Sequence, residues 1–281
     1  VQKVHLGRSQ FRGLLWGVRE RLRGMPEDER PRVLVFGESL GSWSSSDVVM
    51  HQGIAGFDHY GIDHALWFGL VGLDKWSKTG MRQGSSDLVP PGTVGAFDHF
   101  GQYEKLSKEE RKKLRAVIVD HDNDPIAQMS FRWAVKRPPW LDGEDRGRNV
   151  PEGMQWVPLI TFVQIMVDAM NAMRTVPGQF KSFGHDYRGD TAHFVHAAYQ
   201  LEEVTDEQMQ KVVDTLRQLE LERGERIKNA KAEATDDGDT PKRTSRPRRP
   251  KPGVYLRDRT PLDADEPAIE ITAGDAPAEL Q

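Results

Sequence analysis

The sequence contains no cysteine, has no long uninterrupted apolar run and carries little net charge. The absence of cysteine excludes disulfides, thiolate metal sites and cysteine nucleophiles. No window reaches the roughly 18 apolar residues of a membrane span, and the segment after Val1 is not typical of a signal peptide. The most apolar segment, which begins at Met154, is interrupted by polar residues, and we expect it to be a buried strand followed by a core helix. A net charge of −4 over 281 residues argues against a nucleic-acid partner.

The composition changes along the chain. Hydrophobic residues make up 37% of the sequence and the mean hydropathy is −0.64, so we expect part of the chain to contribute nothing to a core. Residues 205–234 are highly charged and carry a narrow apolar stripe, which predicts an amphipathic helix. Seven of the 17 prolines lie after residue 240, so we predict that 235–281 is a disordered tail. Residues 1–204 remain as the folded domain.

Within that domain, short apolar runs alternate with helical patterns. Apolar positions at helical spacing follow Ser9, which is suited to cap a helix. Residues 33–36 and 64–70 are runs typical of buried strands, and another begins at Arg115 after the charged helical segment 107–114. This alternation predicts βαβ units and a mostly parallel sheet. In such sheets the functional residues follow the carboxyl ends of the strands.

The first apolar run leads directly into Gly37-Glu38-Ser39-Leu40-Gly41, which matches the pattern G-x-S-x-G. In a sharp strand-to-helix turn, glycines at 37 and 41 would relieve steric clashes while Ser39 accepts backbone strain and exposes its hydroxyl as a nucleophile. The N–H of Leu40 would then contribute to an oxyanion hole at the start of the helix. The alternative is that Ser39 only caps that helix.

A serine nucleophile needs a base and an acid that orients it, and both are available in the expected chain order Ser, Asp, His. Asp124 follows a strand in "HDNDP", and His185 lies in the glycine-containing loop "SFGHDYRGD". Other residues compete for these roles. They are Asp120 and Asp122 for the acid, and His121, His193 and His196 for the base.

Five blocks carry a more specific joint pattern: "PRVLVFGESLGSW", "DHALWFGL", "VIVDHDNDPIAQMSFRWAVKRPPWL", "GMQWVPLITFVQIMVD" and "FGHDYRGDTAHFVHAAY". Together, over roughly residues 9–199, they resemble the catalytic domain of the bacterial membrane-associated α/β-hydrolase family, in which this domain follows an N-terminal bundle of transmembrane helices. The resemblance implies an α/β-hydrolase-like sheet with flanking helices and no cofactor or metal. It also implies that Ser39 is the nucleophile, Asp124 the acid and His185 the base.

The sequence departs from that family in two places. The family has strands and a second oxyanion donor upstream of the helix near Ser9, so we expect a catalytic domain that is incomplete at its N-terminus. The family tends to show Gly-His-Gly-His around the histidine, and residues 182–185 keep only the second pair. A chain that begins with valine is also expected to be a fragment or a processed product.

Two functions follow from the resemblance. One is ester or thioester hydrolysis, or acyl transfer, on an apolar small-molecule or lipid acyl substrate in a membrane-associated setting. The other is a catalytically degenerate domain that binds a membrane-complex partner through an open sheet edge.

Several patterns allow second interpretations. Asp120-His121-Asp122 is similar to the aspartate pair of a magnesium-dependent phosphatase; a calcium loop is excluded because Pro125 and Phe131 replace its glycine and its last carboxylate. A metal cluster could use His51, His59, His64, Asp58 and Asp63, although their spacing fits no standard pattern.

Two further patterns concern binding. The basic segment 241–253 is either a solvated tail or a patch for anionic lipids or nucleic acid. Five tryptophans are candidates for an acyl pocket or for ordinary packing: Trp67, Trp76, Trp133, Trp140 and Trp156.

Overall fold

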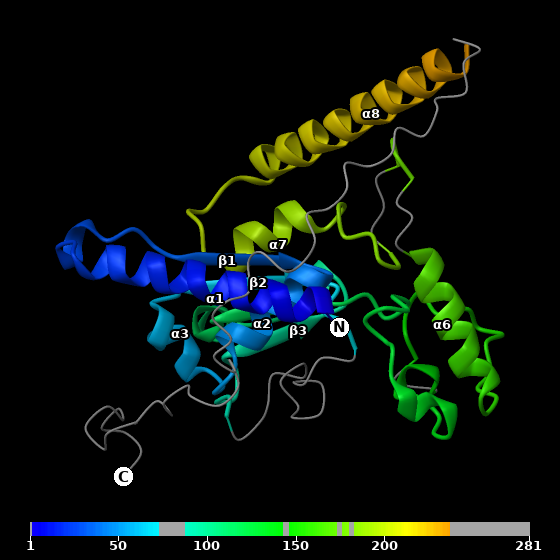
Figure 1. The fold of residues 1–281 in the computed structure, drawn as a ribbon, viewed down its shortest axis with the longest axis horizontal. Helices are drawn as coiled ribbons and strands as arrows, with labels where there is room; N and C mark the ends of the chain where they lie inside the picture. Colours follow the sequence, from blue (N-terminus) through cyan, green and yellow to red (C-terminus); the bar gives the residue numbers. More distant parts are fainter. Residues whose placement is uncertain (1, 73–87, 143–145, 173–175, 180–182, 237–281) are drawn as a thin grey trace, which may run out of the picture. The chain divides into compact units, whose positions relative to one another are not determined.

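The structure is a computed structural model that describes residues 2–72, 88–142, 146–172, 176–179 and 183–236 (Figure 1). The strands are β1 (Leu34–Glu38), β2 (His64–Phe68), β3 (Val94–Phe97) and β4 (Ala116–Val119). The helices are α1 (Gln2–Arg23), α2 (Leu40–Val49), α3 (Ala55–Tyr60), α4 (Phe100–Glu104), α5 (Lys108–Lys113), α6 (Ile160–Ala172), α7 (Thr191–Ala198) and α8 (Asp206–Asp236). Short 3₁₀ turns cover Glu27–Glu29, Phe131–Ala134 and Pro139–Leu141.

The strands form one parallel sheet in the order β1-β2-β4-β3, and Figure 1 shows them side by side. Their carboxyl ends are in register, because Glu38 pairs with Phe68, and Val119 pairs with both Phe68 and Phe97. The expected mostly parallel α/β sheet with flanking helices is therefore confirmed. This register also brings the residues that follow each strand to a single edge of the sheet.

Helices cover both faces of the sheet because its central strands are apolar on both sides. Ala65 and Trp67 of β2 pack in a cluster with residues of α1, α2 and α3. Leu66 and Phe68 of the same strand point the other way, into a cluster that includes Phe194 of α7. These four side chains are at most 1% exposed, which fits the continuous apolar run in the sequence.

The first helix begins earlier than the sequence indicated. We predicted Ser9 as a cap residue, but α1 starts at Gln2 and Ser9 lies exposed within it. The reason is that Val4, only 3% exposed, lies 11 residues before the equally buried Leu15, close to three helical turns, so the buried face extends upstream of Ser9. The charged segment 107–114 forms α5 as expected, and Ser107 caps it in a capping box with Glu110.

The segment that begins at Met154 also differs from the prediction. Residues 154–159 form no strand, because Pro158 interrupts them and Leu159 adopts a left-handed φ of 62°. The helix that follows, α6, is not a core helix. It buries Ile165 and Ala169 but exposes much of the rest of its apolar surface. One strand, β3, was not predicted, because "VGAF" is short and contains a glycine.

The amphipathic helix predicted at 205–234 is confirmed as α8, although most of its apolar stripe is exposed. Val213 is 8% exposed, whereas Val212 and Leu219 are 49% and 52% exposed. The predicted disordered tail lies, from residue 237 onward, outside the described residues. Within the described ranges, no helix is both long enough and apolar enough to cross a membrane.

The packing of α3 against α2 leads to a stability prediction. A Cβ added at Gly56 would lie 1.7 Å from the carbonyl oxygen of Val49, whereas one at Gly13 in α1 would meet no atom within 4 Å. We expect Gly56→Ala to lower the free energy of unfolding by about 1–3 kcal/mol or more through overpacking. Gly13→Ala should raise it by about 0.5–1 kcal/mol because alanine favours a helix. Urea denaturation of the two variants tests this, and equal stabilities would contradict the packing described.

Candidate active site

Ser39 lies at the sharp turn between β1 and α2. Its backbone has φ 55° and ψ −118°, a left-handed conformation that is strained for a residue with a side chain. The turn is fixed by the Ser39 N–H, which donates to the Phe68 carbonyl oxygen at 2.9 Å. Its side chain makes no capping hydrogen bond to α2, so the interpretation of Ser39 as an ordinary helix cap is wrong. Among the residues that the structure describes, the hydroxyl at this strained turn has no hydrogen-bond partner.

The two glycines of the motif have different roles. A Cβ at Gly37 would lie 2.9 Å from the Cα and N atoms of Ser42 and from the Ser45 hydroxyl, so the tight turn requires glycine there. A Cβ at Gly41 would meet no atom within 4 Å. The expectation that both glycines relieve clashes is therefore correct for Gly37 and wrong for Gly41, which already belongs to the exposed first turn of α2.

Asp124 is a buried carboxylate with 0% exposure. Its Oδ1 accepts the Ile126 backbone N–H at 2.8 Å, while Oδ2 lies 2.7 Å from His185 Nδ1 and accepts the Tyr187 hydroxyl at 2.6 Å. Burial alone raises the pKa of Asp124, but the bonds from His185, Tyr187 and Ile126 outweigh it and hold the pKa below its ordinary value. Asp124 is therefore ionised at neutral pH.

His185 faces Asp124 with one ring nitrogen, and its side chain is only 8% exposed. Burial alone lowers the pKa of His185, but the hydrogen bond and charge of Asp124, with the nearby charges of Glu38 and Asp120, raise it above its ordinary value. The imidazole lies against Gly69, where a Cβ would be 2.7 Å from Cε1. Gly69, which has a left-handed φ of 58°, therefore leaves the space that this ring occupies.

Ser39 lies on the same sheet edge as His185. The residues after three strands continue the ladder, because Ser39, Gly69 and Asp120 donate backbone N–H groups to Phe68, Val119 and Phe97, each at 2.9 Å. The His185 ring touches Gly69, the residue after Phe68. Among the residues that the structure describes, no hydrogen bond joins Ser39 to His185. Catalytic hydrogen bonds of this kind often tighten only when substrate binds.

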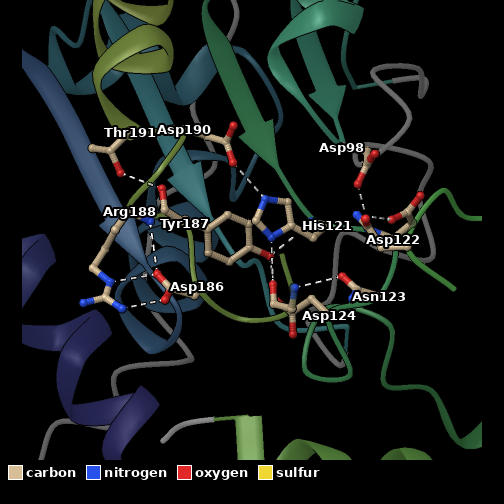
Figure 2. A network of polar contacts seen from close by, with 12 residues as sticks. Asp98, His121, Asp122, Asn123, Asp124, Asp186, Tyr187, Arg188, Asp190 and Thr191 are labelled. Atoms are coloured by element: carbon tan, nitrogen blue, oxygen red, sulfur yellow. Dashed lines mark hydrogen bonds and ion pairs between the residues drawn. The ribbon is translucent and has the colours of Figure 1, made fainter. Parts of the chain in front are cut away.

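No pattern in the sequence indicates that four residues hold Asp124 and His185 in place, although His121 was considered as an alternative base; Figure 2 labels all four. They are His121, Asn123, Tyr187 and Asp190. Tyr187 is 1% exposed, and burial raises its pKa well above the ordinary value, so its hydroxyl stays protonated and donates to Asp124. The only available signal was their position within the two motif blocks, which says nothing about which side chains meet.

Comparison with known proteins places this arrangement in a family. A model of the alpha/beta-hydrolase family matches residues 2–212, more than half of the chain. The chain belongs to the α/β-hydrolase family. No curated protein and no solved structure matches it. The match supports a hydrolase and covers the strands, the turn at Ser39, Asp124 and His185.

The residues that competed with Asp124 and His185 have other partners in this α/β-hydrolase. Asp120 accepts the Leu70 N–H at 2.7 Å, and Asp122 accepts the backbone N–H of Arg148. His193 lies 5.0 Å from the Phe100 ring, and His196 hydrogen-bonds to the Glu202 carbonyl oxygen. His121 is fully buried in the network around Asp124.

Other groups bear on the chemistry. Leu40 is the first residue of α2, so its backbone N–H has no partner within the helix and is available at the helix's positive end. In the described part of the chain, no group of three His, Asp or Glu side chains is placed to hold a metal ion. Two histidines of the proposed metal cluster contact other groups: His59 packs edge-on against Trp16, and His64 lies 3.2 Å from an Arg32 nitrogen.

An apolar cluster adjoins the edge of the sheet that holds Asp124 and His185. Val71, after β2, and Ile126, after Asp124, pack with Ala169 of α6 and Trp43 of α2. From there α6 extends an exposed apolar surface that includes Val163, Val167 and Met170, at 57%, 50% and 71% exposure. Thus one end of the parallel sheet combines a charged dyad with adjacent apolar surface.

The five tryptophans considered for an acyl pocket have separate roles. Trp67 is fully buried in the core and donates to Ser45, so the acyl-pocket interpretation is wrong for it. The indole N–H groups of Trp133 and Trp156 donate to backbone carbonyl oxygens of Gln128 and Trp133. Trp140 is half-buried, and Trp76 lies outside the described residues.

The strain at Ser39 leads to a prediction. Glycine adopts φ 55° at no steric cost, whereas alanine keeps the Cβ that causes the strain. We therefore expect Ser39→Gly to be more stable than Ser39→Ala by about 1–3 kcal/mol in the free energy of unfolding. Thermal or urea denaturation of the two variants, compared side by side, measures the difference. If Ser39→Gly proves less stable than Ser39→Ala, the turn is not strained as described.

Proposed function

We propose that this α/β-hydrolase is a serine hydrolase that acts on acyl esters or thioesters, by hydrolysis or acyl transfer, through Ser39, His185 and Asp124. The observation that carries the proposal is the 2.7 Å contact between His185 Nδ1 and the buried Asp124 carboxylate, on the edge where the strained turn exposes Ser39. An acid, a base and a hydroxyl in this chain order are the groups that acyl-enzyme chemistry requires.

The proposed mechanism assigns one role to each group. His185 takes the Ser39 proton as Oγ bonds to the substrate carbonyl carbon, and the resulting oxyanion accepts the Leu40 N–H. Asp124 holds the Nδ1 proton and stabilises the imidazolium. Collapse of the tetrahedral intermediate breaks the bond to the leaving group, which receives the proton from His185. Water or another hydroxyl then attacks the acyl-enzyme, returns a proton to Ser39 through His185 and releases the acid or the new ester.

Charge and apolar surface around the turn favour a neutral, apolar acyl group. Glu38 and Asp120 lie close enough to His185 to raise its pKa, so their charges would repel an anionic substrate. The exposed apolar side chains of α6 begin at the cluster that adjoins the catalytic edge. An acyl chain on this surface would bury area that is otherwise in contact with water.

A second candidate function is binding of a partner, in a membrane-associated complex, by a degenerate hydrolase domain. The observation that favours it is the position of β1 at one end of the described sheet order. Its Leu34 and Phe36 side chains are 38% and 49% exposed. An exposed edge strand with apolar side chains is suited to pair with a further strand.

The first test uses a fluorophosphonate probe, which reacts with activated serines. We expect the wild-type chain to be labelled and Ser39→Ala to remain unlabelled, because we propose Ser39 as the serine that His185 activates, and the Asp124 carboxylate orients His185 at the same end of the sheet. Asp124→Asn should lower the labelling rate by on the order of 10⁴-fold, since the asparagine fixes the wrong imidazole tautomer. A folded wild-type protein that takes no label would contradict the proposal and leave partner binding as the function.

The pH dependence of labelling tests the assignment of the base. His185 must be neutral to accept a proton, so the rate should rise with pH through a pKa that lies above the ordinary histidine value. In Asp124→Asn the main cause of the raised pKa is removed, so the residual rate should rise at lower pH than in the wild type. A midpoint that does not move in this variant would assign the rise to another group.

Substrate preference is tested with p-nitrophenyl esters of increasing acyl length. We expect kcat/KM to increase with length, by up to about threefold to fourfold per methylene that is removed from water. Val167→Asp on α6 should weaken this dependence, and Gln164→Asp on the same helix is the matched control for the added charge. Equal kcat/KM for all chain lengths would exclude an apolar acyl pocket.

A further inference from the structure

The loop after β4 holds the segment that carries His185 through three of its residues. His121 contacts the Gly184 carbonyl oxygen, Asn123 accepts the Gly184 N–H at 2.8 Å, and Asp124 bonds His185 itself. The peptide groups on both sides of Gly184 are therefore fixed from the same loop that supplies the acid. Gly184 has a left-handed φ of 61°, so this turn favours glycine at that position.

His121 makes two contacts of the same kind, which determines its protonation state. Nδ1 lies 2.8 Å from the Gly184 carbonyl oxygen, and Nε2 lies 3.1 Å from Asp190 Oδ2 at the start of α7 (Figure 2). A carbonyl oxygen and an ionised carboxylate accept hydrogen bonds and donate none. Because a neutral imidazole has a single N–H, both contacts are hydrogen bonds only when the ring carries two protons.

The environment of the ring supports a fixed imidazolium. His121 is 0% exposed and its ring stacks on Tyr187, with centroids 4.2 Å apart and planes 16° apart. Burial alone lowers the pKa of His121, but the bonds to Asp190 and Gly184, with the charges of Asp190 and Asp98, raise it above its ordinary value. The charged or titratable groups that face the ring are thus Asp190, the residue before α7, Asp98, the residue after β3, and Tyr187.

We propose that His121, as an imidazolium, is a positioning residue. It holds the peptide bond before His185 through a hydrogen bond to the Gly184 carbonyl oxygen and so orients the imidazole of His185. This inference rests on the proposed function. Loss of its proton would leave one ring nitrogen with a lone pair facing an acceptor. The remaining proton would stay on Nε2, which faces the Asp190 carboxylate, so the contact of Nδ1 with the Gly184 carbonyl oxygen would become repulsive. The Gly184–His185 peptide would lose its bond to His121, and Asn123 would hold only the peptide before it.

The consequence is a second limb in the pH profile. His121 has a hydrogen-bond acceptor at each ring nitrogen, whereas His185 has Asp124 at one, so we expect His121 to keep its second proton to higher pH. Labelling of Ser39 should then rise as His185 becomes neutral and fall as His121 loses its proton. The stabilisation that the charged His121 gives to this segment is present at low pH and is lost as the pH rises through its raised folded-state pKa. The profile is therefore a bell whose alkaline side belongs to His121.

The test combines kinetics with NMR of ¹⁵N-labelled imidazoles in the full chain. We expect both His121 nitrogens to be protonated at neutral pH, with the signal assigned by its absence in His121→Gln. In the same spectra, the downfield Nδ1 proton of His185 should weaken as His121 titrates. His121→Gln, which cannot supply two N–H bonds in this geometry, should lower the labelling rate by up to about 100-fold and remove the alkaline limb.

Two further variants separate positioning from a general structural role. Asp190→Asn removes the charge that holds the proton, so the His121 midpoint and the alkaline limb should both move to lower pH. Asn123→Ala removes the hydrogen bond to the Gly184 N–H, and asparagine does not titrate. This variant should therefore lower the labelling rate and leave the alkaline limb of the pH profile in place. Asp190→Asn also keeps the proposal testable if His121→Gln does not fold.

Three results would overturn the inference: a His121 ring with a single protonated nitrogen at neutral pH, an alkaline limb unaffected by Asp190→Asn, or a His185 proton signal indifferent to His121. The NMR measurements need no activity and can be made in Ser39→Ala. Failure of Ser39 to react would therefore count against the proposed function, while the charge on His121 is decided separately.

Discussion

Much of this structure depends on one carboxylate that has no contact with solvent. Burial of an unpaired charge would cost several kcal/mol, so Asp124 can stay ionised only if its oxygens are bonded. The three donors come from different places: a backbone N–H two residues on, a phenol from the segment before α7, and the imidazole of His185. Each hydrogen bond that stabilises the Asp124 charge also fixes the position of the group that donates it. The same interaction therefore stabilises the loop after β4 and orients the histidine.

The register of the sheet is what allows those pieces to meet. Because the four strands end together, the chain leaves the sheet at adjacent points, and the backbone ladder continues for one residue beyond β1, β2 and β4. That extra bond holds Ser39 in its strained conformation beside Gly69. A side chain at position 69 would displace His185, so the absence of one is as necessary to the site as the imidazole itself. The strained turn at Ser39 and the space that Gly69 leaves for His185 therefore depend on the same alignment of strand ends.

The sequence predicted the parts of the fold that are governed by local patterns. Three strands were found from short apolar runs, and the fourth was missed because four residues with a glycine carry too little periodicity. The start of α1 was misjudged since a serine inside a helix looks like a cap when the buried face upstream rests on one residue, Val4. Ser39, Asp124 and His185 could be proposed from chain order and motif. His121, Tyr187 and Asp190 could not, because their roles arise from contacts between residues more than 60 positions apart.

The error over α6 has a physical reason that bears on function. Apolar residues on all sides of a helix usually mean burial, and on that basis we expected a core helix. The helix instead buries only a narrow face of small and branched residues, of which Ala169 packs with Val71 and Ile126 beside the candidate site, and leaves the rest of its apolar surface in water. Folding alone gives no reason to retain so many exposed apolar side chains, since polar ones would serve as well at those positions. The proposed substrate with an apolar acyl chain would supply a reason, because it would cover this surface only while its carbonyl group lies at the turn that presents Ser39.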